Sequence, residues 1–509
     1  MEQRIPAVSI RNITKRFGQT LANDHVSLDI YRGEVLALLG ENGSGKTTLM
    51  NMLSGIYFPD EGSIAIDGHE VVIDSPRKAI ELGIGMIHQH FKLVDLLSAA
   101  ENIELGLKGK LDIPAASKRI REISEAYGFE IDPAQKVYDM SVSQKQTVEI
   151  LKVLYRGADI LILDEPTAVL TPQETEKLFQ VLRNMRNDGK AIVIITHKMN
   201  EVLELSDRVA VLRKGEYVGD MATAETSAQD MTNQMVGHAV SLNIERPQPV
   251  NPIPRIEVSH LTVRNEAGVI RLDDVSFTAR SGEILGIAGI AGSGQKELLE
   301  AIAGLQPVES GSIRYLEDDG TPEELIGKDP LEIQKMGVAL SFVPEDRLGM
   351  GLVGSMDLNE NMMLRTYRTG ASPVTDRKTP HELAERVVHD LDVVTPNLHT
   401  PVRNLSGGNV QKILVGREIT SAPKVLLTAY AVRGLDINSS YVIYDLLNQQ
   451  KKKGVAVIYV GEDLDVLLEL ADRILVLCAG KVSGEVAGKD AVKDEIGLMM
   501  TSVGGGRHE

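Results

Sequence analysis

The chain repeats itself, and this duplication constrains its fold more than any other feature. The segment Val26–Ile56 recurs as Val275–Leu305 at an offset of 249 residues. Further on, Met140–Lys152 matches Leu405–Arg417 at an offset of 265, so the second copy has gained 16 residues. Because a domain usually spans ~100–200 residues, each copy has room for a core of its own. The sequence therefore predicts two tandem domains of one fold.

A proline-rich segment separates the two copies. Within Arg246–Arg255 the prolines are Pro247, Pro249, Pro252 and Pro254. Chains of this composition are extended and semi-rigid. We therefore expect a first domain over residues 1–243, a connector over 244–255 and a second domain over 256–509. We expect the extra residues of the second copy in loops around Leu316–Pro330.

Each copy has an α/β pattern. Residues 33–40 and 160–164 are short, nearly continuous apolar runs, typical of strands buried on both faces of a parallel sheet. A glycine-rich turn follows the first run, and the pattern of Thr47–Ile56 predicts a helix. Ser98–Val148 is charged and helix-forming with few strand signals, which indicates a helical subdomain.

Composition excludes several classes of protein. Lys and Arg number 54 against 72 Asp and Glu, and the net charge of −18 argues against a broad nucleic-acid surface. The single cysteine, Cys478, excludes an internal disulfide framework. The longest apolar runs, such as Ala191–Ile195, fall far below the ~20 residues of a spanning helix. We expect a soluble, cytosolic protein with no nucleic-acid partner, and we assign no role to the tail Gly504–Glu509.

A phosphate-binding loop follows the first strand of the first copy. It has the form GxxxxGK[ST] between a strand and a helix, as its mechanism requires. Glycines let backbone N–H groups turn towards phosphates, and the helix N-terminus adds positive potential. Lys46 would reach the phosphate oxygens, and the Thr47 hydroxyl would bind Mg²⁺. The predicted phosphate-binding loop consists of Gly40, Glu41, Asn42, Gly43, Ser44, Gly45, Lys46, Thr47 and Thr48.

Two carboxylates end the buried strand that begins at Ile160. Asp164 would hold Mg²⁺, and Glu165 would polarise the attacking water as general base. Alone, two acids at a strand end also suit a solvated terminus. Because they follow a phosphate loop by about 120 residues, they indicate the metal and base pair.

These motifs resemble those of the tandem ATP-binding subunits of ABC importers, and the resemblance covers nearly the whole chain. It also rests on Gln89 in MIHQHF, His197 in IITHK and the signature Leu405–Gly408. The resemblance implies two P-loop ABC domains, each with a RecA-like core and a helical subdomain. It implies that Gln89 senses Mg²⁺ and the membrane partner, that His197 contacts the γ-phosphate, and that Phe17 stacks on adenine.

The resemblance implies ATP and Mg²⁺ as cofactors. The expected catalytic residues are Glu165, His197, Lys46 and Gln89. The expected metal-binding residues are Thr47, Gln89 and Asp164. Stacking on Phe17 is tolerant of base identity, so it does not distinguish ATP from GTP.

The two copies have lost different motifs. In place of Lys46, Thr47, Gln89, Asp164, Glu165 and His197, the second copy has Gln295, Lys296, Glu345, Ala429, Tyr430 and Glu462. The first copy has a defective signature with Ser143 where a glycine belongs, and Thr171 where the second copy has Asp436.

The lost motifs of the two copies fall in the same composite site. In the family, each ATP lies between the phosphate loop of one domain and the signature of the other. The resemblance therefore implies one intact composite site, which joins the first copy's loop to Ser406, Gly407, Gly408 and Asp436. The other site is degenerate, and binding without hydrolysis and an empty scaffold both stay open for it.

A transport role requires further subunits. The resemblance implies two transmembrane permeases, each with a cytoplasmic coupling helix near Gln89 or Glu345, and an extracytoplasmic substrate-binding lipoprotein. The chain would then be peripheral on the cytoplasmic face of the cell membrane. The segment Met86–Gly106 looks more like the nucleoside branch than the branch for simple sugars. The alternatives are a soluble ribosome-associated tandem ATPase and a nucleotide-binding module without turnover.

Overall fold

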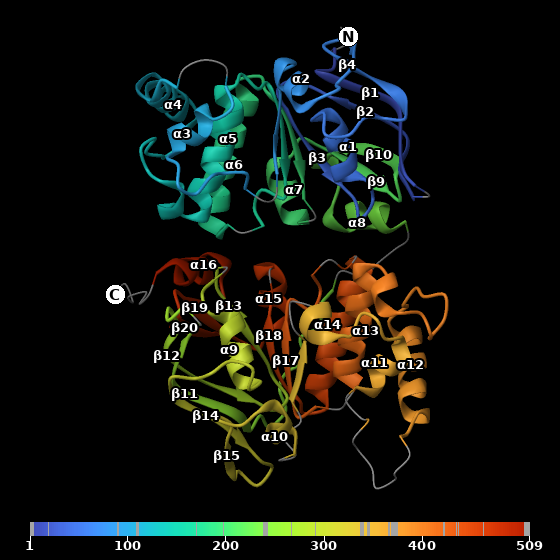
Figure 1. Ribbon diagram of the computed structural model, residues 1–509, viewed down its shortest axis with the longest axis vertical. Coiled ribbons are helices and arrows are strands. Elements are labelled where there is room, and N and C mark those ends of the chain that lie inside the picture. The colour runs from blue at the N-terminus through green and yellow to red at the C-terminus, as the bar shows by residue number, and fades with distance from the viewer. Residues whose placement is uncertain are drawn as a thin grey trace. The chain divides into compact units, whose positions relative to one another are not determined.

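The chain divides into two compact units in the computed structural model of the protein: residues Met1–Ser241 and Leu242–Glu509 (Figure 1). The structure describes residues 5–18, 20–88, 91–107, 111–168, 170–196, 198–237, 243–265, 267–290, 292–335, 340–343, 347–364, 367, 375–420, 423–433, 435, 437–461 and 463–502.

Two sheets form the framework of the first unit. An antiparallel sheet has the order β2-β1-β4-β5, and a six-stranded sheet has the order β10-β9-β3-β8-β7-β6. The six-stranded sheet is parallel except for the pair β9 and β10. The strands are β1 (Val8–Phe17), β2 (Thr20–Ile30), β3 (Glu34–Leu39), β4 (Glu61–Ile66), β5 (His69–Val71), β6 (Ile84–Ile87), β7 (Ile160–Asp164), β8 (Ala191–Ile195), β9 (Arg208–Arg213) and β10 (Glu216–Ala222).

Helices cover the six-stranded sheet, whose central strands β3 and β8 are buried along their whole length. The helices are α1 (Lys46–Leu53), α2 (Pro76–Glu81), α3 (Ala99–Glu104), α4 (Ile113–Tyr127), α5 (Val142–Tyr155), α6 (Pro172–Asn187), α7 (Met199–Leu205) and α8 (Ala228–Val236), with 3₁₀ turns at Val137–Asp139 and Thr223–Glu225. This burial on both faces explains why β3 and β7 are nearly continuous apolar runs in the sequence.

The expected helical subdomain is present. Helices α3, α4 and α5 lie together on one side of the first unit (Figure 1). They enclose a small core of their own, formed by Ala99, Ala100, Ile103, Ile120, Val137, Met140, Val148 and Leu151. Local signals fix these helices: α3 and α5 each begin with a capping box, and α4 ends at Gly128 in the left-handed conformation.

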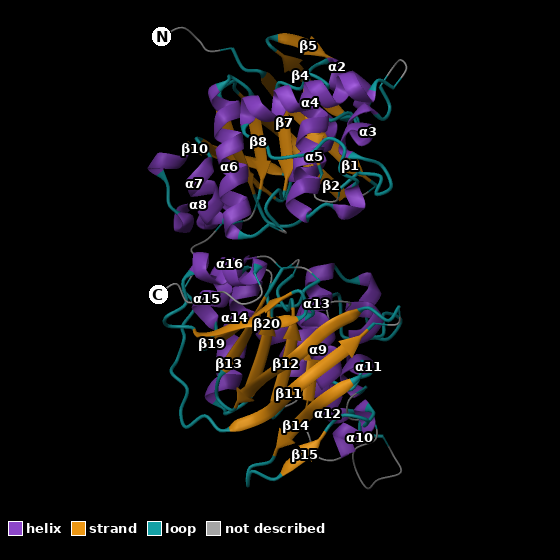
Figure 2. Cartoon of the chain, turned by 90° about the vertical axis from the view of Figure 1, so that its left-hand side faces the viewer, coloured by secondary structure: helices purple, strands orange, loops and turns teal. Residues whose placement is uncertain are grey.

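The second unit repeats the same topology. Its sheets have the orders β12-β11-β14-β15 and β20-β19-β13-β18-β17-β16. Figure 2 shows the four antiparallel strands side by side. The strands are β11 (Pro254–Arg264), β12 (Ile270–Arg280), β13 (Ile284–Ala288), β14 (Ser310–Leu316), β15 (Pro322–Glu324), β16 (Leu340–Val343), β17 (Val425–Ala429), β18 (Ala456–Val460), β19 (Arg473–Cys478) and β20 (Lys481–Ala487).

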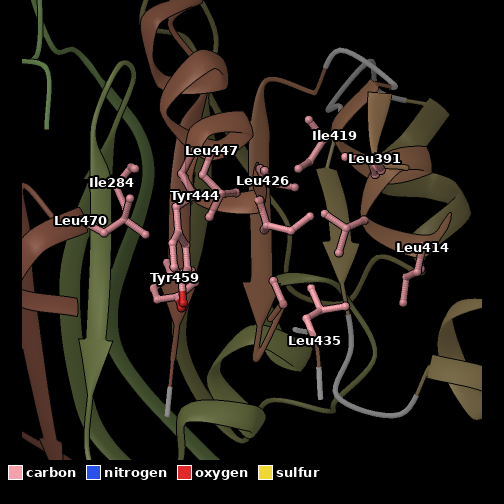
Figure 3. Close-up of a cluster of buried hydrophobic side chains, with 14 of the residues drawn as sticks. Ile284, Leu391, Leu414, Ile419, Leu426, Leu435, Tyr444, Leu447, Tyr459 and Leu470 are labelled. Atoms are coloured by element: carbon pink, nitrogen blue, oxygen red, sulfur yellow. The ribbon is translucent and has the colours of Figure 1, made fainter. Parts of the chain in front are cut away.

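Its helices complete the correspondence between the copies. They are α9 (Gln295–Ile302), α10 (Pro330–Lys335), α11 (Leu358–Met363), α12 (Lys378–Asp390), α13 (Gly407–Thr420), α14 (Ile437–Lys452), α15 (Leu464–Leu470) and α16 (Lys493–Thr501), with a π-turn at Arg347–Gly351 and a 3₁₀ turn at Val402–Asn404. Figure 3 shows part of the core that these helices share with the sheet. The predicted α/β fold with two tandem domains is confirmed.

The extra residues of the second copy are spread more widely than the sequence suggested. The starts of α2 at Pro76 and α10 at Pro330 are 254 residues apart, only five more than the offset of 249 at the phosphate loops. The starts of α4 at Ile113 and α12 at Lys378 are 265 residues apart. Loops around Leu316–Pro330 therefore hold a minority of the insertion, and the rest precedes α12.

The residues before β11 pack against the second unit. Ile244 is buried in its core. The Asn448 amide donates to the Glu245 carbonyl at 2.6 Å, and the Arg246 guanidinium donates to the carbonyls of Leu468 and Ala471 at 3.0 and 3.1 Å. The proline-rich segment is thus anchored at its start before it enters β11 at Pro254.

In the part of the chain that the structure describes, no helix combines the length and apolarity needed to cross a membrane.

Candidate functional site

The phosphate loop of the first unit lies between β3 and α1. Gly40, Gly43 and Gly45 all have positive φ, at 152°, 83° and 97°. A Cβ atom at Gly40 would collide with the Leu212 carbonyl and the Ser44 hydroxyl, and one at Gly45 with the Ala22 carbonyl. The loop therefore requires glycine at these positions, as expected for a cradle of inward-turned backbone amides.

Lys46 lies inside this loop. Its side chain is 8% exposed, and Nζ donates to the carbonyls of Gly40 at 2.7 Å and Glu41 at 3.0 Å. Burial lowers the pKa of Lys46, and the carboxylates of Glu165, Asp164 and Glu41 oppose that shift. A buried ammonium held beside backbone amides is suited to a polyanion.

A second polar group of the loop also fits a phosphate. The Ser44 hydroxyl is buried, and among the described residues it has no hydrogen-bond partner. Buried polar groups normally have partners, so such a hydroxyl indicates a missing one. The residues present therefore fit a bound polyphosphate.

Two of the three predicted magnesium ligands lie together, and the third, Gln89, is outside the described residues. Thr47 at the start of α1 and Asp164 at the end of β7 are 3.4 Å apart, from Oγ1 to Oδ2. Burial raises the pKa of Asp164, and neighbouring Glu165 adds to this shift, whereas Lys46 and Thr47 oppose it. No cluster of three His, Cys, Asp or Glu with metal geometry occurs in the described part of the chain. Mg²⁺ needs none, because one or two protein oxygens plus phosphates and water suffice.

Glu165 has an unusual backbone conformation. Its φ is 50°, in the left-handed region, and its N–H donates to the Ile195 carbonyl of β8 at 2.9 Å. A non-glycine residue there costs ~1–3 kcal/mol and persists where surrounding contacts impose it. Tyr430, its counterpart in the second unit, has φ 52° and donates to the Val460 carbonyl at 2.8 Å. The backbone is thus the same in both units, and only the side chain differs.

An aromatic pair is exposed at the end of β1. Phe17 is 44% exposed, and its ring meets that of Tyr57 edge-to-face at a centroid distance of 5.1 Å. Exposed aromatic rings provide a surface for base stacking. The sequence indicated Phe17 but not Tyr57, because Tyr57 reaches the pair only through the fold.

The two signature helices both begin at a serine that accepts a hydrogen bond from the backbone N–H three residues on, and they differ in the two residues after it. In the first unit, Ser141 and Gln144 form a capping box over the start of α5. In the second unit, Ser406 accepts hydrogen bonds from Asn409, and Gly407 and Gly408 have no side chain to cover the first turn of α13. Ser406 and Gly407 are exposed. A helix N-terminus of this kind suits an anion.

The second phosphate loop keeps the positive φ of the first at two of its described glycines. Gly292 and Gly294 have positive φ, at 86° and 101°. Gln295, 4% exposed, donates to the Ile290 carbonyl at 3.2 Å, which parallels the contact of Lys46 with Glu41. Lys296 lies within 3.8 Å of Glu300. Glutamine therefore takes over the lysine's contact with the loop but not its charge.

Several predicted residues lie outside the described part of the chain, namely Gln89, His197, Asp436, Glu345, Glu462 and the tail Gly504–Glu509. Their predicted roles, and the pairing of the first phosphate loop with Ser406, stay predictions. The structure brings together Lys46, Thr47, Asp164 and Glu165 within the first unit.

A polar cluster near Glu165 was not predicted from the sequence; it is formed by the buried Thr167 and Thr196 and the partly buried Glu201. The duplication contains a signal for it. At the offset of 265 residues the second copy has Val432, Gly461 and Val466, so all three polar groups are lost together.

A groove separates the core of the first unit from its helical subdomain. It has a volume of about 260 Å³ and lies between α2, β6 and α5. Its walls include Ile56, Ile80 and Met86, and its polar residues include His88, Lys152 and Arg156. Burial, together with the nearby Lys92, lowers the pKa of His88.

Comparison with known proteins agrees with this geometry. The ABC transporter domain family matches residues 23–168 and 272–428. The nucleoside import ATP-binding protein NupA of Lactococcus lactis is 41% identical, with 99% of each chain covered. The glucose import ATP-binding protein TsgD13 of Haloferax volcanii is 39% identical (99% of this chain, 96% of that one). The guanosine import ATP-binding protein NupO of Bacillus subtilis is 40% identical, with 97% of each covered.

Among solved structures, an archaeal ribosome recycling factor in complex with a ribosomal stalk protein matches with a TM-score of 0.61. Its sequence is 16% identical, and the match covers 94% of this chain and 90% of that one. At this identity the likeness concerns the fold alone.

The chain belongs to the ABC transporter family. It is an ABC-type ATPase with two tandem ATP-binding domains, which confirms the family, fold and enzyme class predicted from the motifs.

Proposed function

We propose that this chain energises the import of nucleosides across the cell membrane by hydrolysing ATP at one composite site. The observation that carries the proposal is the convergence of Lys46, Thr47, Asp164 and Glu165 where β3 and β7 end, at the same edge of one sheet. In the second unit Tyr430 has the backbone conformation of Glu165, and Gln295 makes a contact with its loop like that of Lys46, but neither the lysine nor the base is present.

Each residue of the first site has a distinct role in the proposal. The Lys46 ammonium and the amides of the loop bind the phosphates, and Phe17 with Tyr57 contacts the base. Thr47 and Asp164 hold Mg²⁺, which would supply charge neutralisation at the phosphates. Glu165 accepts a proton from the attacking water, and a positioned base of this kind contributes ~10²–10⁴-fold in rate.

We infer that the exposed start of α13 completes the same site in the assembled transporter. Gly407 and Gly408 place no side chains over its first turn, which suits the γ-phosphate end of a nucleotide. The corresponding turn of α5 carries the side chains of Val142 and Ser143, and this difference supports a second site without turnover. ATP then acts as a ligand that selects the closed state of the two units.

The proposed partners are two transmembrane permeases, and through them an extracytoplasmic substrate-binding lipoprotein. Full-length similarity to import ATP-binding proteins supports this assembly. The groove between α2, β6 and α5 offers apolar walls to a cytoplasmic helix of a permease, next to His88. The chain would therefore lie on the cytoplasmic face of the membrane, without nucleic acid.

Nucleosides are the proposed cargo, on the strength of the named relatives NupA and NupO. Simple sugars are the second candidate, favoured by the glucose-import relative. The transported solute contacts the binding protein and the permeases, so the cargo assignment must be tested with those subunits.

The experiment purifies the tagged full chain from membranes and identifies its co-purifying proteins. The proposal predicts two permeases, whereas ribosomal particles would contradict it. The ATPase rate of the assembled complex is then measured with the partner binding protein and with nucleosides, pentoses or hexoses. Stimulation by sugars alone would transfer the cargo assignment to the second candidate.

A further inference from the structure

Three polar side chains connect the ends of two neighbouring strands in the first unit, two of them buried and the third, Glu201, 12% exposed. The hydroxyl of Thr167 donates to the Glu201 carboxylate, 2.6 Å from each carboxylate oxygen. The hydroxyl of Thr196 donates to the same carboxylate at 3.3 Å. Both threonines are 1% exposed. We call this cluster the Thr167–Glu201–Thr196 staple.

The staple lies beside the proposed general base. Thr167 follows Glu165 by two residues in the turn after β7, and Thr196 comes directly after β8. Glu201 reaches both from α7, and Lys198 Nζ lies 3.1 Å from its carboxylate. Lys198 also approaches the Thr167 carbonyl at 3.4 Å. The cluster therefore fixes the turn that carries Glu165 against the end of β8.

The second unit shows what the fold needs without this cluster. Val432, Gly461 and Val466 replace its three members, and Val432 and Val466 pack against the apolar core. A Cβ atom at Gly461 would lie 2.7 Å from the Tyr459 ring, so aromatic packing occupies this region (Figure 3). Nevertheless, Tyr430 keeps the left-handed φ of Glu165 and the bond from its N–H to β18.

The comparison of the two units distinguishes what the backbone of this turn requires from what ATP hydrolysis requires. Because Tyr430 adopts the conformation without a staple, the backbone of Glu165 does not require one. Replacing a buried charged network by well-packed apolar groups is often neutral or stabilising. The polar set is present only where the turn carries a carboxylate, which points to a role in aligning that carboxylate.

We propose that Glu201 is a positioning residue for ATP hydrolysis, acting through the hydroxyls of Thr167 and Thr196 to align Glu165. This inference rests on the proposed role of Glu165 as general base. Misplacement of a reacting group by about 1 Å can cost ~10²-fold in rate. A supporting shell of hydrogen bonds is what prevents such misplacement.

The test substitutes Thr167→Val, the residue of the second copy, in the full chain assembled with its permeases. We expect kcat to fall ~10- to 100-fold while KM and the affinity for ATP stay within twofold. Thr167→Ser keeps the hydroxyl and should restore most of the turnover. Glu201→Gln should lower kcat as well, and the double variant Thr167→Val with Glu201→Gln should lose less than the product of the single losses.

Thr223→Val serves as the matched control. The Thr223 hydroxyl is buried in the same unit and lies 2.8 Å from Ser206 Oγ, remote in sequence from the motifs. It should lower the Tm as much as Thr167→Val does and leave kcat unchanged. If both variants lower Tm and neither lowers kcat, the staple is only structural and the proposal is wrong.

Glu165→Gln, measured in parallel, separates the two hypotheses. If turnover is lost in Glu165→Gln but not in Thr167→Val, the positioning role of the staple is wrong and the base role of Glu165 stands. Turnover retained in Glu165→Gln overturns the base assignment, and the staple proposal with it. If Thr167→Val fails to fold, Thr167→Ser and Glu201→Gln still decide: normal kcat in Glu201→Gln overturns the proposal.

Discussion

The two phosphate loops share backbone features in their described residues but differ in the side chains that would bind and hydrolyse a nucleotide. Glycines with positive φ shape both loops, and Lys46 and Gln295 both donate to loop carbonyls. Likewise Glu165 and Tyr430 share a left-handed conformation and a hydrogen bond to the neighbouring strand. The comparison teaches that packing preserves the shape of such a site after its charges are gone. The geometry of a phosphate loop alone therefore does not indicate ATP hydrolysis; the side chains at the site determine whether it can occur.

The largest expected effect is that of Glu165→Gln. The substitution keeps the size and hydrogen-bonding reach of the side chain but removes the base, so turnover should fall by at least ~10²–10⁴-fold. Nucleotide binding should persist, since the phosphate loop is unchanged. Phosphate release by the assembled complex and retention of labelled ATP measure the two quantities. Near-normal turnover would show that another group takes the proton.

Lys46→Gln should have the next largest effect, because it converts the first loop to the composition of the second. Gln295 shows that glutamine can bond the loop carbonyls, so the fold should persist. Loss of the charge-assisted bonds to phosphate costs about 1.5–3 kcal/mol. We therefore expect ATP affinity to fall ~10- to 150-fold with little change in Tm. The measurements are nucleotide titration and thermal unfolding.

The reciprocal variant sharpens this comparison. Gln295→Lys restores one charge to the second loop, but Ala429 and Tyr430 still lack carboxylates. Turnover of Glu165→Gln with Gln295→Lys should therefore stay as low as that of Glu165→Gln alone. Recovered turnover would mean that the second site needs only its lysine.

The sequence predicted most of the fold because the duplication repeats the pattern of strands, turns and helices. The apolar runs of β3 and β7, the glycines around Lys46 and the charged helical stretch each have a local pattern. The acids Asp164 and Glu165 were found for the same reason. Glycine and carboxylate signals are local, so they can be recognised without a structure.

Other parts of the site depend on contacts that the sequence does not display. Tyr57 joins Phe17 only because the turn after α1 comes back to the end of β1. Glu201 lies 34 residues from Thr167, and its carboxylate belongs to an otherwise ordinary amphipathic helix. The predicted position of the extra residues was wrong for those before α12, because loops have no periodicity by which the two copies could be aligned.

Gly408→Ser tests the proposed contribution of the second unit to the intact site. Ser143 already occupies the matching position in α5, so a serine fits the helix. The added side chain would cover the first turn of α13, where a helix terminus contributes up to ~2 kcal/mol to a bound anion. Turnover should fall about 10-fold. Ser143→Gly is the matched control and should leave turnover unchanged. Equal losses of turnover in both variants would show that the two signature helices contribute equally, which would contradict the proposal of one intact site.

Tyr430→Phe should have the smallest effect. The ring, its packing against Arg433 and the left-handed backbone all survive the substitution, and only the hydroxyl is lost. Because the second site has no carboxylate at Ala429 or Tyr430 to hold a metal or accept a proton, that hydroxyl has no step to serve there. ATPase activity of the assembled complex should stay within about twofold, the range of ordinary substitutions worth ±0.5 kcal/mol. A collapse of turnover with an unchanged Tm would show that the second unit takes part in the chemistry, and the division of labour between the two loops would then be wrong.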